Sequence, residues 1–267
     1  MNTTEDRAIR VVSVGHAVFA ATMVALGIFG LIQGNFTPTW TGVPKSVPMR
    51  EVLAYLCAFL SLATGIGLLW QRAAVVASRV LLIYLLVWLL AFRVANIFRA
   101  PTALDTWWVL GDTMVMTAGA WVLYAWFADD RDGRFSFATG DRGLRITRLL
   151  YGLALIPFGV AHFINLKDTA PLVPDWLSWH VAWAYFTGGA FIAAGAAVLI
   201  GVCARLAAVL SAVQLGLFTL LVWAPVVAAG PNAFQWSEFL DSWALTAGAW
   251  LVADSYRDMP WLAVGKR

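Results

Sequence analysis

Apolar residues run along this chain in long blocks that are separated by short polar stretches. A helix needs roughly 20 apolar residues to cross a hydrocarbon core about 30 Å thick, and eight blocks reach that length. Lipid offers no partner to an unpaired backbone amide, so every block is expected to be helical. The pattern therefore predicts spans at residues 10–33, 50–70, 74–97, 107–127, 146–165, 179–200, 204–228 and 238–256.

The composition agrees with a membrane protein. Hydrophobic residues make up 61% of the chain and charged residues 12%, whereas a soluble domain has about 45–50% apolar and about 25% charged residues. Much of the surface must therefore face the lipid bilayer. The fold class expected is an all-α polytopic membrane protein with eight transmembrane helices.

The positive charge of the chain indicates topology. Thirteen of the 18 Lys and Arg residues fall on one side of the predicted spans and five on the other. Because cytoplasmic loops carry the excess of basic residues, both termini are predicted to be cytoplasmic, which fits an even number of spans. The basic residues lie between apolar blocks, so the net charge of +3 does not indicate nucleic-acid binding.

One phrase occurs twice in the sequence. The stretches "DTMVMTAGAW" (112–121) and "DSWALTAGAW" (241–250) share the five residues TAGAW, 129 positions apart. "GIFGLI" (27–32) likewise aligns with "GVAHFI" (159–164). Internal similarity of this kind predicts two copies of a four-span unit, at residues 10–128 and 146–256, joined by a cytoplasmic linker at 129–145. Each unit has an even number of spans, so the two repeats are expected to insert in parallel.

Residues 159–222 resemble the DoxX-like family of integral membrane proteins. The shared features are an H-F pair at the end of the first span, the loop "LVPDWL", a Y-x-T-G motif and an R-x-A-A motif. The first half is similar to a diverged copy of the same four-helix unit. The resemblance implies the fold, a place in the bacterial cell (inner) membrane, and association with redox assemblies, because the family includes a subunit of thiosulfate:quinone oxidoreductase.

Two carboxylates lie within predicted spans, Asp112 in the fourth and Asp241 in the eighth. An ionisable group at mid-helix costs at least about 2.5–3.5 kcal/mol and usually faces a partner or a wet cavity. Each acid shares its helix face with a glycine seven residues later, so both are expected to point into the bundle. Arg93, at the end of the third span, is the predicted partner of Asp112 in a structural ion pair.

The second acid has no arginine at the corresponding position, which by sequence alignment falls near Ala228. Its expected partners are therefore His162, His180, Lys167 or water. We expect His162 and Asp241, with Tyr185 and Glu238 nearby, to line an outward-facing pocket for a small hydrophobic molecule such as a quinone. His180 and Trp236, on the same side, complete the candidate set. The alternative is that the histidine and the acid only hydrogen-bond to each other and pin the helices.

No Walker loop, nucleophile elbow or dinucleotide fingerprint is present, and the three histidines lack metal-ligand spacing. The sequence thus assigns no metal and no resident cofactor, with quinone as the candidate ligand. Three function classes remain open. The first is a redox-associated component that binds quinone or anchors an oxidoreductase subunit. The second is a carrier that uses Asp112 and Asp241, and the third is a non-catalytic assembly factor. The sequence leaves the oligomeric state open and favours a protein that is not an enzyme on its own.

Overall fold

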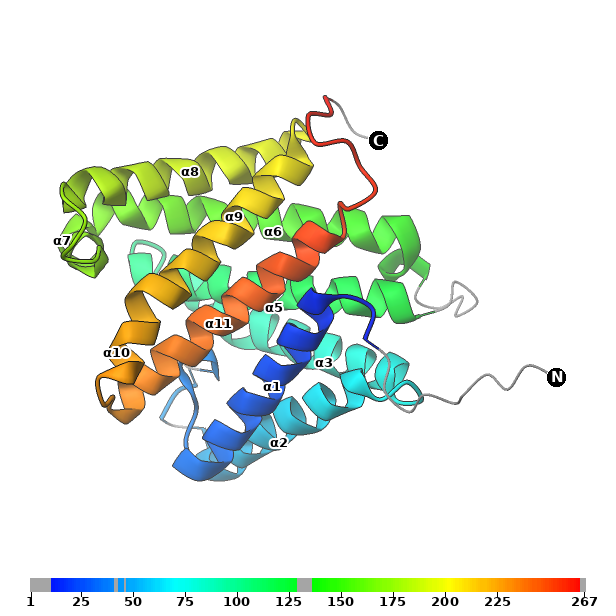
Figure 1. Ribbon diagram of the computed structural model, residues 1–267. Coiled ribbons are helices and arrows are strands. Elements are labelled where there is room, and N and C mark those ends of the chain that lie inside the picture. The colour runs from blue at the N-terminus through cyan, green and yellow to red at the C-terminus, as the bar shows by residue number, and fades with distance from the viewer. Residues whose placement is uncertain (1–10, 41–42, 46, 129–135, 265–267) are drawn as a thin grey trace.

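The computed structural model describes residues 11–40, 43–45, 47–128 and 136–264, and this part of the chain is almost entirely helical (Figure 1). Of the predicted linker, residues 129–135 lie outside the described residues. In chain order the elements are α1 (Val14–Gln33), η1 (Pro38–Trp40), α2 (Arg50–Leu69), α3 (Ala74–Trp88), η2 (Leu89–Val94), α4 (Ala95–Arg99), α5 (Leu104–Phe127), η3 (Ser136–Ala138), α6 (Gly140–Ile164), α7 (Leu166–Thr169), η4 (Ala170–Leu172), α8 (His180–Ile200), α9 (Ala204–Phe218), η5 (Thr219–Trp223), α10 (Ala224–Ala228) and α11 (Ala233–Asp254).

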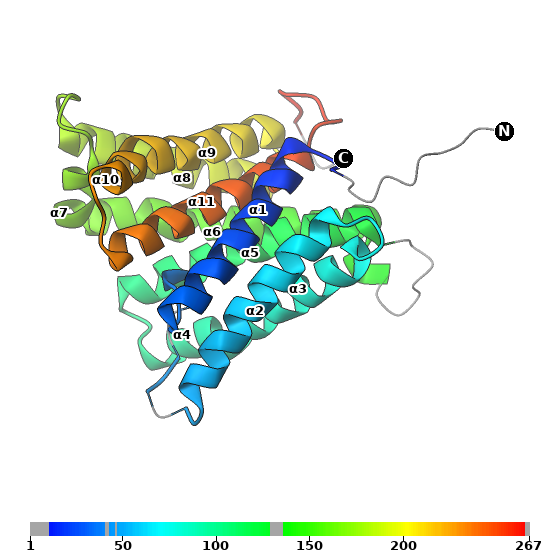
Figure 2. The same ribbon diagram turned by 60° about the horizontal axis from the view of Figure 1, so that its bottom comes forward.

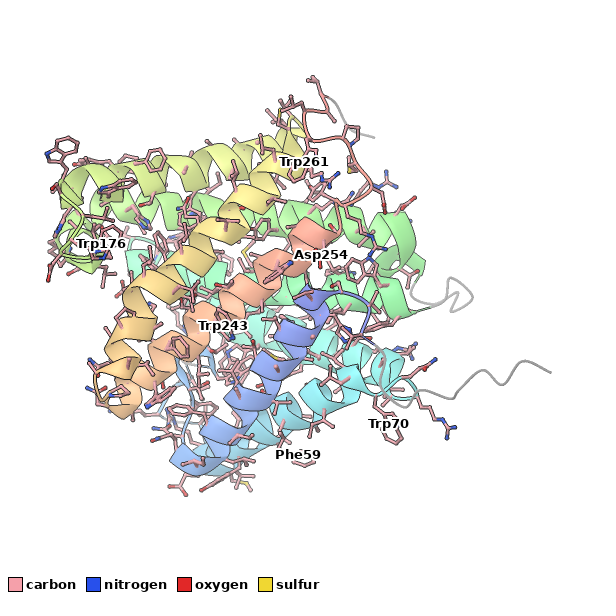
Figure 3. The ribbon with its side chains drawn as sticks, viewed as in Figure 1. Phe59, Trp70, Trp176, Trp243, Asp254 and Trp261 are labelled. Atoms are coloured by element: carbon pink, nitrogen blue, oxygen red, sulfur yellow. The ribbon has the colours of Figure 1, made fainter. Side chains whose placement is uncertain are left out.

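Within the described residues, six helices are long and apolar enough to cross a membrane, as in a multi-pass membrane protein. They are α1, α2, α6, α8 and two continuous runs, Ala74–Arg99 and Ala204–Ala228. Large apolar side chains on these helices face outward: Phe59 on α2 is 59% exposed, and Figure 3 shows Phe59 and Trp70 pointing away from the bundle. Such a surface suits contact with lipid rather than water.

The two remaining long helices, α5 and α11, lie at the centre (Figures 1 and 2). They have 24 and 22 residues, which correspond to about 36 Å and 33 Å of helix. Every residue of α5 from Leu110 to Ala125 is buried. Helices α5 and α11 pack against each other, while α1 covers α11 and α6 covers α5. A lower hydropathy suits α5 in this position, since the other helices shield most of its surface, whereas half of the residues of α11 are buried.

The same packing pattern occurs in both halves of the chain. Helices α3 and α9 both have 15 residues and begin 130 positions apart, at Ala74 and Ala204, and each continues into a π-helical turn. A Cβ atom on Gly65 of α2 would meet the Ala20 carbonyl oxygen of α1 at 2.8 Å. A Cβ atom on Gly195 of α8 would meet the Gly152 carbonyl oxygen of α6 at the same distance. The pair α1–α2 is thus packed as the pair α6–α8 is.

The expected correspondence between the third and seventh predicted spans needs correction. The π-helical turns η2 and η5 begin at Leu89 and Thr219, also 130 positions apart, so Arg93 corresponds to Trp223 and not to Ala228. The reason is that the segment from the start of α3 to the start of η2 has the same length as the segment from the start of α9 to the start of η5. The alignment of short sequence motifs had placed Arg93 opposite Ala228 by assuming an insertion that the helices do not contain.

The central helices also begin earlier than the hydrophobic pattern predicts. The start of α11 is fixed by a capping box, in which the Asn232 side chain accepts from the Gln235 backbone and the Gln235 side chain accepts from the Asn232 backbone. Such polar residues start a helix without adding to its apolar run. Asp112 and Asp241 each lie eight residues after the first residue of their helix. They are therefore about 12 Å, or two turns, inside it rather than one.

Candidate functional site

Six polar side chains gather where α5, α11, η1 and η2 meet. This polar cluster consists of Thr39, Arg93, Asp112, Thr113, Glu238 and Asp241. It joins residues from both halves of the chain, because η1, η2 and α5 belong to the first half and α11 to the second. The candidate site is therefore between the two halves and not within the second one, where the sequence predicted it.

The centre of the polar cluster is Arg93, which is only 1% exposed. Its Nε donates a hydrogen bond to Thr113 Oγ1 at 3.0 Å, and its Nη2 donates to the Thr39 carbonyl oxygen at 2.9 Å. Arg93 belongs to the π-helical turn η2, and π-helical turns within α-helices are frequent at functional sites. A guanidinium as buried as this one needs negative charge close by, because taking it out of water costs several kcal/mol.

Two acids supply that negative charge. The charge of Arg93 acts on both Asp112 and Asp241, and these two carboxylates act on each other. Asp241 Oδ1 accepts a hydrogen bond from Thr39 Oγ1 at 2.7 Å. Asp112 is 7% exposed, and its Oδ1 is buried without a hydrogen-bond partner. Asp241 thus has Thr39 and Arg93 as neighbours in place of the histidine expected from the sequence, and both acids share one cation.

The TAGAW phrases bring the two acids together. A Cβ atom on Gly119 of α5 would lie 2.8 Å from the Gly248 Cα atom of α11, so the helices touch at their glycines. Small residues permit this close approach of two backbones. Since Asp112 is seven residues before Gly119 and Asp241 seven before Gly248, α5 and α11 run in the same direction from the acids to the glycines. This contact agrees with the expectation that each acid and the glycine seven residues later lie on the same, inward-facing side of the helix.

An aromatic wall continues from the polar cluster through η1. It consists of Trp40, Tyr84, Trp88 and Phe92. Trp40 follows Thr39 directly, and its ring centroid is 4.7 Å from that of Tyr84 and 5.4 Å from that of Trp88. Trp88 is in turn 4.5 Å from Phe92. The Nε1 atoms of both tryptophans are buried and have no hydrogen-bond partner. A buried donor without a partner is unusual, and it favours a site that an acceptor from outside the chain completes.

His162 lies in a different environment. Its Nδ1 donates to the Phe158 carbonyl oxygen at 2.7 Å, which leaves Nε2 as the acceptor. Its ring stacks with those of Trp108 and Phe218 and contacts that of Phe191, at centroid distances of 6.1, 6.0 and 5.7 Å. Across the ranges that the structure describes, no hydrogen bond or ring contact joins His162 to Asp241.

The other predicted ligand-binding residues are spread over the surface of the second half. Tyr185 is 43% exposed and contacts Phe163 of α6. His180 is the first residue of α8 and is partly exposed. Trp236 is 39% exposed and packs on Phe239. The structure therefore brings together Asp241, Glu238, Asp112 and Arg93, and it leaves His162, His180, Tyr185 and Trp236 apart from them.

Sequence reasoning missed the two threonines and the aromatic wall. Thr39 lies in the loop "FTPTW", which carries no helical periodicity, and its role depends on η1 folding back onto α5 and α11. No motif in the sequence sets Trp40 and Trp88 apart from the other tryptophans. The only signal for Thr113 was its place beside Asp112. Among the described residues, no group of three or more His, Cys, Asp and Glu side chains could hold a metal ion.

Comparison with known protein families gives a match to a domain of unknown function. The model of a domain of unknown function (DUF8561) matches residues 151–240, about a third of the chain, from α6 to the second turn of α11. No match was found among curated proteins or among solved structures.

Proposed function

We propose that the protein is an eight-span membrane protein that binds a small hydrophobic ligand of the quinone class at the polar cluster. The observation that carries this proposal is the position of Arg93, Asp112 and Asp241 next to an aromatic wall with two unpartnered, buried N–H groups. In this proposal the protein serves a redox assembly of a bacterial cell membrane, as its resemblance to DoxX-like proteins implies.

The proposed architecture is a parallel duplication of a four-helix unit. Support comes from the constant spacing of α3 and α9, from the matched glycine contacts of α1–α2 and α6–α8, and from the parallel course of α5 and α11. The first unit would contain α1 to α5, and the second α6 to α11. Helices α5 and α11 complete the eight spans because their lengths of about 36 Å and 33 Å exceed the hydrocarbon core.

Both ends of the chain are proposed to be cytoplasmic. The first turn of α1 lies beside the last turn of α11: a Cβ atom on Gly15 would be 2.9 Å from Asp254 Oδ2. A membrane-impermeant maleimide tests the orientation with the native cysteines, since Cys203 is partly exposed and Cys57 is buried. Labelling of Cys203 in inside-out vesicles and not in right-side-out vesicles is expected. The reverse result would refute the orientation.

The chemistry of a quinone matches what the site offers. A quinone head group is a flat ring with two carbonyl oxygens, which accept hydrogen bonds. The Nε1–H groups of Trp40 and Trp88 are donors without partners, and Arg93 is a charged donor next to them in the fold. Aromatic rings favour offset or edge contacts with another flat ring. Small-molecule sites commonly combine such an apolar lining with a few well-placed polar groups.

A photoreactive quinone with cross-link mapping by mass spectrometry tests the site. We expect labelled peptides from η1 and from α3–η2, and we expect labelling to fall in the variants Asp241→Asn and Trp88→Phe. The second change removes the N–H donor and keeps an aromatic ring. His162→Ala is the control, because His162 lies outside the polar cluster. Labelling that stays unchanged in both site variants would refute the proposal, and loss only in His162→Ala would move the ligand to the second half.

A proton-linked carrier is the second candidate function. It is favoured by the meeting of one acid from each half at the contact between the halves, where relative movement of two repeats would act. Proteoliposomes with an imposed proton gradient and a panel of small organic acids and amines test this function. Uptake that depends on the gradient and is lost in both Asp112→Asn and Asp241→Asn would support it. Equal uptake by either variant and the unaltered protein would exclude these acids as the coupling site.

A further inference from the structure

We infer that the polar cluster holds one proton, shared between the carboxylates of Asp112 and Asp241. The inference rests on a charge count inside a nearly closed site. Arg93 contributes one positive charge, and the two aspartates would contribute two negative charges if both were ionised. A single guanidinium balances only one of them.

The hydrogen bonds of the site show which carboxylate oxygen lacks a compensating donor. Asp241 Oδ1 accepts from the Thr39 hydroxyl, and the contacts of Arg93 include Thr113 Oγ1 and the Thr39 carbonyl oxygen. Asp112 Oδ1 has no donor although it is buried. An ionised carboxylate oxygen in that position would keep its full desolvation cost with no compensating bond. A proton turns one carboxyl group into a donor and removes the excess charge.

The other groups that face the pair do not supply the missing positive charge. From α11, Glu238 adds a further negative charge that acts on Asp112, although Glu238 is partly exposed and so remains in contact with its surroundings. From η1 and α5, Thr39 and Thr113 are neutral. Arg93 on η2 is the one cation whose charge acts on Asp112 among the described residues. Two carboxylates that act on each other beside one cation compete for the same proton, so we assign the proton to the pair.

A shared proton gives the site a chemical capacity that neither aspartate has alone. The protonated carboxyl group can donate to an acceptor oxygen of a ligand, while its partner remains a carboxylate that keeps Arg93 neutralised. Binding of a cationic group would instead displace the proton. Occupation of the site is therefore linked to proton binding or release, and this conclusion holds whether or not the ligand is a quinone.

Infrared difference spectroscopy on the full-length, ligand-free protein tests the inference. A protonated carboxyl group has a carbonyl stretching band that shifts in heavy water. We expect such a band at neutral pH in the unaltered protein, and we expect its loss in both Asp112→Asn and Asp241→Asn. Each single change leaves one aspartate carboxylate for the one guanidinium, while Glu238 is partly exposed, so the aspartate that remains needs no proton. Glu238→Gln is the matched control and should keep the band.

Arg93→Gln gives an independent check with the opposite sign. Without the guanidinium, both carboxyl groups must be neutral, so the band should roughly double. Absence of the band in the unaltered protein, or its persistence in both asparagine variants, would overturn the inference. The infrared experiment uses no quinone, so a failed quinone cross-link does not affect its result. A missing band would refute the shared proton and would leave the ligand proposal to be decided by the cross-linking experiment.

Discussion

The contact of α5 with α11 at their TAGAW phrases can be tested by one methyl group. In the Gly119→Ala variant, the new Cβ atom would lie 2.8 Å from the Gly248 Cα atom and 3.2 Å from its carbonyl oxygen. Carbon atoms prefer separations of about 3.5–4.0 Å. Both neighbours are backbone atoms that cannot turn away, so the helices themselves must separate.

The magnitude follows from two opposing effects. Overpacking of a close contact costs typically about 1–3 kcal/mol, while alanine is about 1 kcal/mol more favourable than glycine within a helix. Gly189→Ala on α8 is the matched control, because a Cβ atom there meets nothing within 4 Å. The control is expected to gain up to about 1 kcal/mol. The difference between the two variants thus isolates the overpacking cost of about 1–3 kcal/mol.

Unfolding of the purified protein in mixed micelles with increasing SDS, followed by tryptophan fluorescence, gives this difference in free energy. Separation of α5 from α11 also moves Asp112 away from Asp241, so the shared-proton infrared band should weaken in Gly119→Ala and remain in Gly189→Ala. If Gly119→Ala is as stable as Gly189→Ala, the two helices do not touch at their glycines. The account of how the acids meet would then be wrong.

Three further predictions concern the loop and the C-terminal segment. Thr39→Val removes the hydroxyl donor to Asp241 and should lower the free energy of unfolding by about 1–3 kcal/mol, whereas Thr39→Ser keeps the donor and should change it little. Arg205 bonds the Met259 carbonyl oxygen and lies over the Trp261 ring, so Arg205→Gln should speed deuterium exchange in residues 259–264 and leave α5 unaffected. Burial raises the pKa of Tyr256, beyond the end of α11, to about 12. The free energy by which the buried, neutral Tyr256 side chain stabilises the folded protein is fully present below the unfolded pKa of about 10, and it is lost as pH rises towards 12. In the Tyr256→Phe variant, the free energy of unfolding should no longer show this fall when it is measured across the same pH range.

The general fold followed from the sequence because lipid imposes strong constraints. A block of 20 apolar residues has few alternatives to a helix when no water is present. The helix starts were predicted less well, since they depend on caps such as the Asn232 side chain rather than on hydropathy. Six helices are confirmed as apolar enough to span a membrane. Helix α5 falls short as a helix whose surface is covered by its neighbours, and α11 falls short because its first turns carry Gln235, Glu238 and Asp241.

The acids of the site were predictable and their surroundings were not. A carboxylate within an apolar run is costly in any arrangement, so Asp112 and Asp241 stand out without structural information. Which cation reaches them depends on contacts between segments about 150 residues apart, as for Arg93 and Asp241. Reasoning within one repeat paired Asp112 with Arg93 and left Asp241 to a histidine, because sequence spacing contains nothing about contacts between the repeats.

The proposed duplication explains why this site has more acids than bases. Each copy contributes one aspartate from its last helix, and the parallel contact at Gly119 and Gly248 brings the two together. Only the first copy contributes an arginine, because the corresponding position in η5 is Trp223. Two like charges therefore meet one cation at the contact between the copies. A duplicated pair of acids would be a liability in an apolar core unless a proton or a ligand completes it, and the unpartnered oxygen of Asp112 marks the place where that group belongs.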